Sequence, residues 1–401
     1  MKPRPLSIYI HYPYCKAKCT FCAFNKYIHS SEVDEQVYVK AYKREFDFNL
    51  DRFYGNSKPS IESVYFGGGT PSLMQPSTVE AILSHVAARC DLDTTNAEVT
   101  LEVNPTSVEA PKLYSFKCAG VNRVSLGVQA LNPDDLRVLG RDHDVRDARA
   151  AIDLAQRTFG RVSLDFIWGR PAQSPDQWRR ELRDITGLGA QHLSIYQLIV
   201  ERGTAMHKYH QKQPHLFPSE DAQATMYNDT IEIAGVHGYE QYEVSSFAKA
   251  AAARSRHNMG YWTGRNFIGL GPGAHGRVSA VGESARYGTA CIRAPKQWVD
   301  QCLSEAGHGM AKITKMSEVE TRREIMAQGL RLVQGVSVQA LQHVVPHMSI
   351  EDVVDLDMMD TLVQRGLLVA ARDENNGTVI SLRTTPKGLV VLDGILGRLL
   401  K

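Results

Sequence analysis

Three cysteines lie close together near the start of the chain, in the segment His11-Tyr-Pro-Tyr-Cys15-Lys-Ala-Lys-Cys19-Thr-Phe-Cys22. Four further cysteines are scattered along the sequence: Cys90, Cys118, Cys291 and Cys302. Closely spaced thiolates can share one metal centre, whereas a total of 7 cysteines is odd and does not suit a disulfide framework. The spacing therefore predicts a metal site in a reducing compartment.

Two common kinds of metal site are alternatives for these cysteines. Structural zinc usually requires two C-x-x-C halves or added histidines at fixed spacing, and the sequence contains no second half. An electron-transfer [4Fe–4S] centre requires four cysteines, and the remaining cysteines have no motif spacing. Three thiolates on a four-iron cluster would leave one iron open, and an open iron can chelate the amino and carboxylate groups of a methionine.

A glycine-rich turn, Phe66-Gly67-Gly68-Gly69-Thr70-Pro71, follows a predicted strand over residues 63–66. Glycines allow the backbone to approach a ligand closely, because they carry no side chain. The turn is not the G-x-G-x-x-G opener of a dinucleotide-binding helix. A plain connection between a strand and a helix is the alternative interpretation.

Polar side chains follow the ends of other predicted strands. They are Glu102 in LEVNP, Gln129 in SLGVQ, Arg141 in LGRDH and Asp165 in SLDFIWG. Carboxylates can accept hydrogen bonds from ribose hydroxyls or offset a sulfonium charge, and an arginine can pair with a carboxylate. Each residue alone could equally be a surface or capping residue. Together they predict a site for a cationic, hydroxyl-rich nucleoside.

Six short β-branched or apolar runs alternate with helical stretches and would position these groups. The runs are 6–10, 63–66, 98–103, 123–128, 162–167 and 193–199. Such alternation indicates right-handed βαβ units and a parallel sheet. The stretches 79–86 and 148–155 show the 3.6-residue apolar period of helices that cover a sheet. The pattern predicts an α/β fold with an incomplete TIM-type (β/α)6 barrel, and an open sheet is the alternative.

The sequence changes twice after the barrel. From Gly238 it is rich in glycine, aromatic and polar residues, which predicts loops closing over a site. From about Met316 a charged helix, a helix from Ser349 to about Arg365, two short strands about Asn376-Gly377 and a final helix predict a winged-helix-like α+β domain. The expected domains are 1–237 (partial barrel), 238–312 (barrel extension and site loops) and 313–401 (C-terminal domain).

The charge balance excludes several classes of partner. The chain has 46 Lys and Arg against 44 Asp and Glu, and acidic residues oppose basic ones in the C-terminal domain, so we expect no nucleic acid. No apolar run reaches the length of a membrane span. Peripheral membrane association and a homodimer stay open. The first residues lack the pattern of a signal peptide, so we expect a cytoplasmic location, or an organelle matrix if a transit peptide was removed.

The cysteine spacing, followed by the Gly-Gly-Gly-Thr-Pro turn, resembles the radical SAM superfamily. The resemblance implies that Cys15, Cys19 and Cys22 hold a [4Fe–4S] cluster, and that the open iron binds S-adenosylmethionine (SAM) for reductive cleavage to a 5′-deoxyadenosyl radical. It also implies a fold built on a radical SAM barrel and an electron donor for the cluster. The implied SAM contacts are Tyr9, Phe21, Gly68, Gly69, Thr70, Glu102, Gln129, Arg141 and Asp165.

Within that superfamily the sequence resembles the oxygen-independent coproporphyrinogen III oxidase group, through LSIYIHYPYC, YFGGGTPS, EVNP, GVNRVSLGVQ, LGRDH and DFIWGRP. The group contains decarboxylating oxidases (HemN) and haem chaperones (HemW). Three features favour the HemW branch. Ala23-Phe24 replaces a further cysteine of the oxidases, their long N-terminal extension is not seen, and HNMGYW at 257–262 is similar to the HNxxYW motif of the chaperones.

The resemblance implies that the protein binds haem and delivers it to acceptor haemoproteins. His257 would offer its imidazole to haem iron, with Tyr261 and Trp262 packing on the macrocycle. A loop histidine bonded to backbone is the structural alternative, and His275 in IGLGPGAHG is a reserve ligand. The competing functions are an oxidase that decarboxylates coproporphyrinogen III and a radical SAM enzyme that modifies nucleic acid.

Overall fold

The computed structural model describes residues 4–28, 33–106, 110–283 and 285–401. Its main feature is a 12-stranded sheet in the order β14-β13-β12-β11-β1-β4-β5-β6-β7-β8-β10-β9. The middle of this sheet consists of six parallel strands, β1 (Leu6–Tyr12), β4 (Ile61–Gly68), β5 (Glu98–Val103), β6 (Arg123–Gln129), β7 (Val162–Trp168) and β8 (His192–Gln197). These six strands confirm the predicted α/β fold with a partial barrel.

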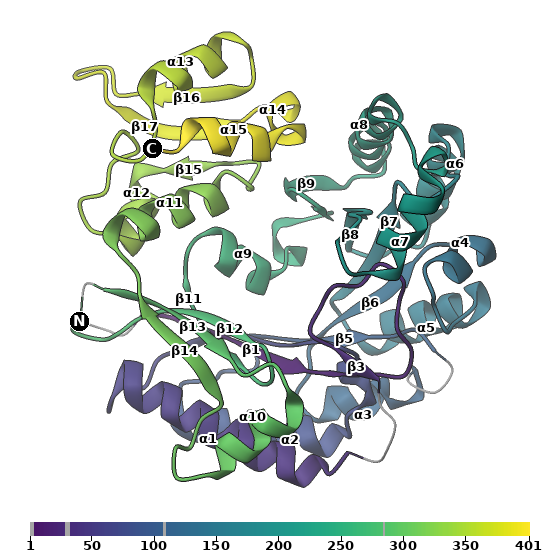
Figure 1. The fold of residues 1–401 in the computed structure, drawn as a ribbon, viewed down its shortest axis with the longest axis vertical. Helices are drawn as coiled ribbons and strands as arrows, with labels where there is room; N and C mark the ends of the chain where they lie inside the picture. The colour runs from purple at the N-terminus through teal and green to yellow at the C-terminus, as the bar shows by residue number, and fades with distance from the viewer. Residues whose placement is uncertain (1–3, 29–32, 107–109, 284) are drawn as a thin grey trace.

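The sheet is strongly curved, and helices cover its convex side. Figure 1 shows the strands running across the lower part of the molecule to β5 and then turning upward through β6, β7 and β8. The covering helices are α1 (Glu35–Tyr54), α2 (Pro76–Arg89), α3 (Leu113–Cys118), α5 (Val145–Thr158), α6 (Pro175–Gly187) and α8 (Glu220–Val236). The apolar stripes predicted at 79–86 and 148–155 are buried in α2 and α5. Two short helices, α4 (Pro133–Val138) and α7 (Ala205–Lys212), lie near the ends of the strands.

Both ends of the sheet are extended by later parts of the chain. Antiparallel β9 (Glu240–Glu243) and β10 (Ser246–Ala248) follow β8, while β11 (Asn266–Leu270) adds to β1 in parallel. Beyond β11 lie β12 (His275–Ser279), β13 (Arg286–Cys291) and β14 (Met310–Lys315), with α10 (Pro295–Leu303) between the last two. The loops predicted after Gly238 lie between these strands and helices, because edge pairing turns several short polar and aromatic runs of the stretch into strands that extend the sheet.

The helix α9 (Arg256–Trp262) lies on the concave side of the sheet, where Figure 1 shows it between the strands and the C-terminal unit. Ser255 caps its N-terminus by accepting a hydrogen bond from the Asn258 amide. This seven-residue helix contains the HNMGYW segment. Its position inside the curve determines the surroundings of that motif.

The C-terminal unit has its own sheet and core. Its elements are α11 (Glu318–Gly329), β15 (Val336–Ser337), α12 (Val338–Val344), α13 (Leu356–Gln364), β16 (Leu368–Arg372), β17 (Val379–Thr384), α14 (Pro386–Val390) and α15 (Leu392–Leu399). The strands pair in the order β15-β17-β16, and a separate cluster of buried apolar side chains lies beneath them. The helix predicted from Ser349 begins later, because the Asp355 side chain caps α13.

Several contacts attach this unit to the barrel, among them the Glu243–Leu332 bridge and a hydrogen bond from Arg4 Nη1 to the Val344 carbonyl at 3.1 Å. The Val333 amide donates to the Tyr242 carbonyl at 3.1 Å, and Arg277 Nε donates to Glu324 Oε2 at 2.8 Å. The Arg331 guanidinium lies over the Trp262 ring, 5.7 Å from its centroid.

Across the described ranges, no helix is both long enough and apolar enough to cross a membrane.

Candidate functional site

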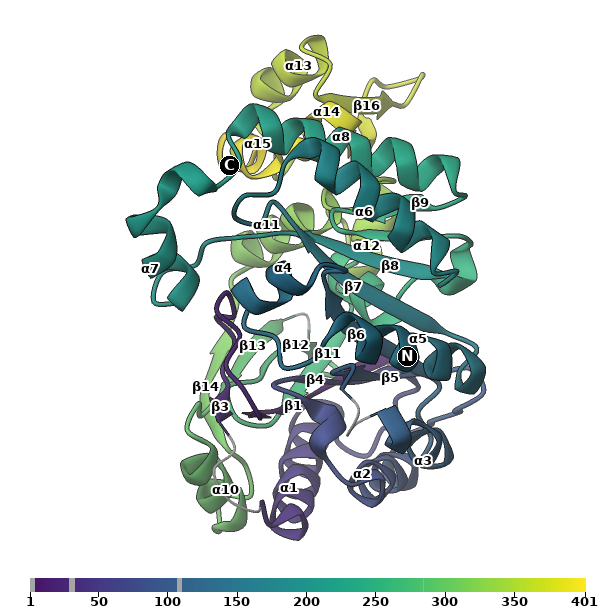
Figure 2. The same cartoon turned by 90° about the vertical axis from the view of Figure 1, so that its right-hand side faces the viewer.

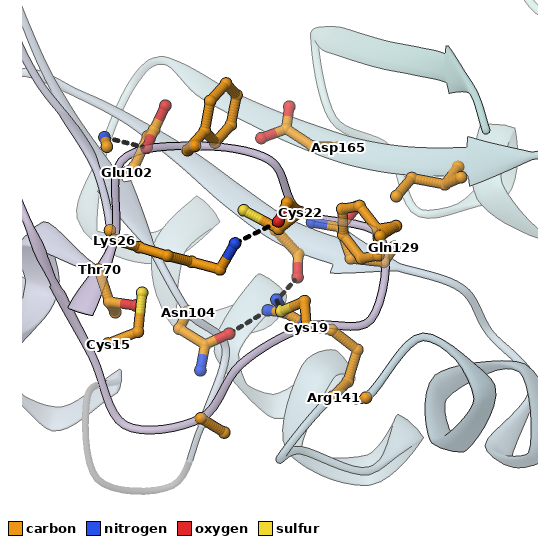
Figure 3. A pocket seen from close by; sticks show the side chains of 18 of the residues that line it. Cys15, Cys19, Cys22, Lys26, Thr70, Glu102, Asn104, Gln129, Arg141 and Asp165 are labelled. Carbon is orange, nitrogen blue, oxygen red and sulfur yellow. Dashed lines mark hydrogen bonds between the residues drawn. The ribbon is translucent and has the colours of Figure 1, made fainter. Parts of the chain in front are cut away.

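A cavity of about 460 Å³ opens at the carboxyl ends of the parallel strands, where barrel folds carry their sites. It brings together most of the side chains that the sequence predicted to act. Those that line it are Cys15, Cys19, Phe21, Cys22, Gly68, Gly69, Thr70, Glu102, Gln129, Arg141 and Asp165. Figure 3 shows many of them around one open space. Residues from β4, β5, β6, β7 and the cysteine segment thus meet at this cavity.

The cysteine segment joins two short parallel strands, β2 (Tyr14–Cys15) and β3 (Tyr27–Ile28). Thr20 fastens its middle, because its amide donates to the Leu139 carbonyl at 3.0 Å and its hydroxyl to the Val138 carbonyl at 2.8 Å. Asn25 fastens its end through Nδ2, which donates to the carbonyls of Pro272 and Arg293, both at 2.9 Å. The protein itself therefore holds the loop that presents the three thiols.

The three thiols differ in exposure. Cys15 is buried, and burial raises the pKa of its thiol to about 11. Cys19 and Cys22 are half-buried. Among the described residues, no three histidine, cysteine, aspartate or glutamate side chains lie close enough to hold a single metal ion. Three soft thiolates at the edge of one cavity fit an iron–sulfur cluster, which spreads its ligands over several irons.

Arg141 reaches across the cavity floor to the cysteine segment. Its Nη1 donates to the Cys19 sulfur at 3.1 Å and its Nη2 to the Gly127 carbonyl at 3.0 Å (Figure 3). The same Nη2 also donates to Asn104 Oδ1. Within the part of the chain that the structure describes, Arg141 Nε is buried without a hydrogen-bond partner. Asn104 was not predicted as a site residue, although it stands in the EVNP segment directly after β5.

Glu102 and Asp165 place two buried carboxyl groups in the cavity wall. Glu102 Oε1 accepts a hydrogen bond from the Tyr65 hydroxyl at 2.8 Å, and Oε2 accepts one from the Gly68 amide at 3.1 Å. Burial raises the pKa of Glu102 to about 7, and the nearby Asp165 adds to this shift. Burial also raises the pKa of Asp165, whose oxygens accept from Ser125 Oγ at 2.9 and 3.1 Å. The sequence did not predict Tyr65 as a site residue.

The glycine turn is shaped by close backbone approach. Gly68 has φ of +108°, and a Cβ atom there would lie 2.5 Å from the His11 ring. A Cβ atom on Gly69 would lie 2.5 Å from the Tyr14 carbonyl oxygen. The turn therefore packs directly against the β1–β2 connection, which explains why glycine is required at these two positions.

Of the described residues predicted to contact SAM, Tyr9 alone is off the cavity lining. Its ring stacks on Tyr65 with centroids 6.1 Å apart, and its hydroxyl lies 3.1 Å from His11 Nδ1. Tyr9 thus belongs to a layer of aromatic rings beneath the cavity. Tyr65 lines the cavity and Tyr9 does not, so the contact of Tyr9 with the ligand stays a prediction.

The structure contradicts the predicted role of His257 as an accessible haem ligand. Its side chain belongs to the barrel interior and is 1% exposed. Both ring nitrogens have partners, with Ser63 Oγ 2.9 Å from Nδ1 and the Tyr261 hydroxyl 2.8 Å from Nε2. Trp262 faces Arg331 of the C-terminal unit. His275 is exposed at the start of β12 but is not among the described residues that line the cavity.

Large apolar side chains stand exposed at the mouth of the cavity. Phe24 is 72% exposed on the cysteine segment, and Ile199 and Tyr196 are 66% and 43% exposed at the end of β8. We call these three residues the apolar rim. Lys16 and Lys26 line the same cavity and bring positive charge to this side.

The chain is similar to known proteins over most of its length. The model of the Radical SAM superfamily matches residues 9–185. The chain is 37% identical to "Radical S-adenosyl methionine domain-containing protein 1, mitochondrial" of Danio rerio, over 98% of this chain and 86% of that protein. It is 32% identical to "Heme chaperone HemW" of Bacillus subtilis, over 82% of this chain and 84% of that protein.

Two further comparisons bear on the branch and the fold. "Heme chaperone HemW" of Escherichia coli is 36% identical over 70% of this chain and 72% of its own length. Among solved structures, coproporphyrinogen III oxidase (HemN) from Escherichia coli has a TM-score of 0.79 at 21% identity, over 98% of this chain and 89% of that chain, which bears on the fold alone. The chain belongs to the radical SAM superfamily, in the HemW branch of its coproporphyrinogen III oxidase-like family.

Proposed function

We propose that this chain binds haem and passes it to acceptor haemoproteins, while SAM and a [4Fe–4S] cluster are held in the barrel cavity. The observation that carries the proposal is the similarity to two proteins named heme chaperones over 72% and 84% of their lengths. Membership of the radical SAM superfamily implies the cluster and SAM. Haem and the acceptor proteins are the part that the proposal adds.

The cavity residues have distinct roles in this proposal. Cys15, Cys19 and Cys22 would hold the cluster, and Arg141 would pair with the SAM carboxylate. When bound, the reduced cluster supplies the electron for cleavage of SAM. Further SAM contacts would come from Phe21, Gly68, Gly69, Thr70, Glu102, Gln129 and Asp165. All four oxygens of Glu102 and Asp165 already accept hydrogen bonds from the protein. A carboxylate has about four acceptor positions, so the remaining positions can accept from ribose hydroxyls.

We place haem at the mouth of the cavity and not inside the barrel. A volume of about 460 Å³ suits one ligand of the size of SAM, since single small-molecule sites span about 300–1,000 Å³. The apolar rim offers exposed aromatic and aliphatic surface to a flat macrocycle. Lys16 and Lys26 can face its propionates. His257, Tyr261 and Trp262 are left out of this site, because His257 is enclosed.

The remaining partners follow from the same chemistry. Cluster reduction requires an external electron donor, which we propose as a further partner. Peripheral membrane association and a homodimer stay predictions. A cluster held by thiolates suits a reducing compartment. We propose the cytoplasm or an organelle matrix as the location, since four relatives have "mitochondrial" in their names.

The proposal is tested anaerobically with reconstituted protein. One sample receives haem and then apomyoglobin, and a parallel sample receives coproporphyrinogen III, SAM and a reductant. We expect a stable Soret shift with haem, transfer to apomyoglobin, and no protoporphyrinogen. Turnover to protoporphyrinogen without stable haem binding would replace the chaperone function by the oxidase function.

Variants of the apolar rim test where haem binds. Phe24→Ser and Ile199→Ser should each weaken haem binding by about tenfold, the loss expected from exposing most of one large apolar side chain. Tyr114→Ser is the matched control, because Tyr114 is exposed on α3 and does not line the cavity. Equal haem affinity of the rim variants and the control would refute the rim as the haem site while leaving haem binding itself intact.

A further inference from the structure

We propose that Tyr65 and His257 are positioning residues that hold the Glu102 carboxylate ready for SAM, so that the HNMGYW segment serves the SAM site from beneath. The inference rests on the proposed function in one respect, namely that Glu102 contacts SAM. It gives the motif a role that does not require access to haem.

The first step is the fixed orientation of the Glu102 carboxylate. Its two oxygens are held separately, Oε1 by the Tyr65 hydroxyl at 2.8 Å and Oε2 by the Gly68 amide at 3.1 Å. Tyr65 and Gly68 both lie on β4, next to the strand that carries Glu102. Since Tyr65 and Glu102 also line the cavity, the hydrogen bond between them is part of its wall.

The second step is the support of Tyr65 by His257. Their rings are stacked, with centroids 4.7 Å apart and planes inclined by 25°. The His257 ring is locked on both sides. Ser63 Oγ donates to Ser7 Oγ at 2.9 Å, so His257 Nδ1 carries the proton that bonds Ser63, and Nε2 accepts from the Tyr261 hydroxyl. Burial lowers the pKa of His257 to about 3, so the ring stacks on Tyr65 as a neutral imidazole.

The third step ties the helix that carries His257 to the strand that carries Glu102. Glu98 accepts hydrogen bonds from the amides of Arg256 and His257, at 3.1 and 3.2 Å. Glu98 and Glu102 lie four residues apart on β5 and so point to the same face of the sheet. One carboxylate of this strand thus anchors α9, and the other faces the cavity. The contacts run from Glu98 to the His257 amide, from the His257 ring to Tyr65, and from Tyr65 to Glu102.

The titratable side chains around Glu102 come from five elements. They are Tyr9 on β1, Tyr65 on β4, Asp165 on β7, Tyr196 on β8 and Tyr261 on α9. Only the Tyr65 hydroxyl among these donates to the Glu102 carboxylate in the described structure. Removal of the Tyr65 hydroxyl should therefore disfavour the charged form of Glu102 and raise its pKa. The neighbouring Asp165 acts in the same direction, because its negative charge repels that of Glu102.

The experiment measures SAM affinity by calorimetry between pH 5.5 and 8.5, in anaerobically reconstituted protein. Tyr65→Phe should lower the affinity at pH 7 by about tenfold, the effect of one hydrogen bond to a charged group, and move the midpoint of the pH profile upward. Tyr239→Phe is the matched control, because its buried hydroxyl donates to the Ala190 carbonyl far from the cavity. An unmoved midpoint in Tyr65→Phe would overturn the inference.

Two variants test His257 independently of Tyr65. His257→Gln keeps groups that can bond Ser63 and Tyr261 but removes the ring, so it should also move the midpoint upward. His257→Phe restores a ring beneath Tyr65 and should recover most of that shift. Equal midpoints for the two variants would overturn the positioning role of His257.

A separate readout distinguishes failure of this inference from failure of the SAM assignment. Infrared titration of the carboxyl groups in SAM-free protein, with Glu102→Gln as the reference, reports the protonation of Glu102 directly. An upward shift of the Glu102 pKa in Tyr65→Phe supports the positioning role. If Glu102→Gln leaves SAM affinity unchanged, only the contact between Glu102 and SAM is removed, and the positioning role stands. No shift in the infrared titration would refute the positioning role itself.

Discussion

The Arg141 guanidinium lies 3.1 Å from the Cys19 sulfur, although the two residues are 122 positions apart in the sequence. The same guanidinium bonds the Gly127 carbonyl at the end of β6 and Asn104 just after β5. The ends of two parallel strands are thereby linked to the cysteine segment. Positive charge is held next to a thiol that is proposed to bind iron, and the planar guanidinium makes these contacts in different directions at once.

Replacement of Arg141 by lysine should therefore not be conservative. Arg141→Lys keeps the charge but cannot bond Cys19, Gly127 and Asn104 at the same time. Loss of a group that bonds a metal ligand typically lowers metal affinity or activity by 10–100-fold. We expect SAM affinity to fall by about this factor, measured by calorimetry at pH 7.5. Arg137→Lys is the control, since Arg137 is exposed on α4 and pairs only with Asp134 in the described structure. Equal affinities of the two variants would contradict a role for Arg141.

The cysteine assignment predicts a simple difference between two cysteine variants. Cys19→Ser should lose most of the iron and acid-labile sulfide after anaerobic reconstitution, because a serine hydroxyl is a poor replacement for a soft thiolate. Cys118→Ser should retain both, since Cys118 is exposed at the end of α3. Iron and sulfide are measured per chain together with the absorption of the cluster. Unchanged iron in Cys19→Ser would remove this residue from the ligand set.

The buried Glu45 side chain, which lies far from the cavity opening, should make the folding stability depend on pH. Its carboxylate accepts from Trp298 Nε1 at 2.9 Å, the Gly309 amide at 3.0 Å and the Gly271 amide at 2.8 Å. Burial nevertheless raises its pKa from 4.5 to about 7. Between these two values the folded protein keeps a proton that the unfolded chain has lost. Its contribution to stability is therefore complete below pH 4.5 and is lost as the pH rises to 7.

The Glu45→Gln variant should remove this part of the pH dependence. The difference in unfolding free energy between wild type and variant should change by about 3 kcal/mol from pH 4.5 to 7, from the shift of the Glu45 pKa. Urea unfolding at several pH values measures it. Glu305→Gln, at an exposed position, should show no such change. Parallel pH profiles of wild type and Glu45→Gln would show that Glu45 does not titrate in this range.

The sequence was sufficient to predict the strands of the barrel and the main lining of the cavity. Each βα unit repeats a local pattern, and the carboxyl ends of parallel strands must meet at one edge, so Glu102, Gln129 and Asp165 could be grouped without coordinates. The glycine turn could be placed for the same reason. In these cases a local signal was enough because the topology determined the rest.

The roles of Tyr65, Asn104 and His257 could not be predicted, because they depend on contacts between segments distant in sequence. Tyr65 reads as an ordinary strand residue until Glu102 is placed on the neighbouring strand. His257 lies in a segment without a strong period, and only the folding of α9 into the curve of the sheet encloses it. Figure 2 shows the later strands β11, β12, β13 and β14 near β1, where they extend the sheet. The motif resemblance predicted an imidazole accessible to haem, whereas the His257 side chain is enclosed in this structure.

The buried ion pairs of Glu98 give the largest expected loss of stability. Glu98 lies 2.6 Å from Arg161 Nη2 and 4.0 Å from Arg123 Nε, and the Arg123 side chain is only 3% exposed. Burial alone would raise the pKa of Glu98, but the charges of Arg123 and Arg161 hold it below its usual value. The stabilisation is therefore present near neutral pH and is lost as the pH falls below about 4.

The Glu98→Gln variant should unfold at markedly lower urea concentration at pH 7.5, with a loss of about 3–5 kcal/mol, because it leaves the Arg123 charge buried without its partner. Glu62→Gln is the matched control. Glu62 pairs with Arg265 nearer the surface, where such a pair contributes about 1 kcal/mol or less. Since Glu98 also holds the first amides of α9, we expect Glu98→Gln to move the pH midpoint of SAM binding in the same direction as His257→Gln. A loss no larger than that of Glu62→Gln would show that the buried arginines are satisfied without Glu98.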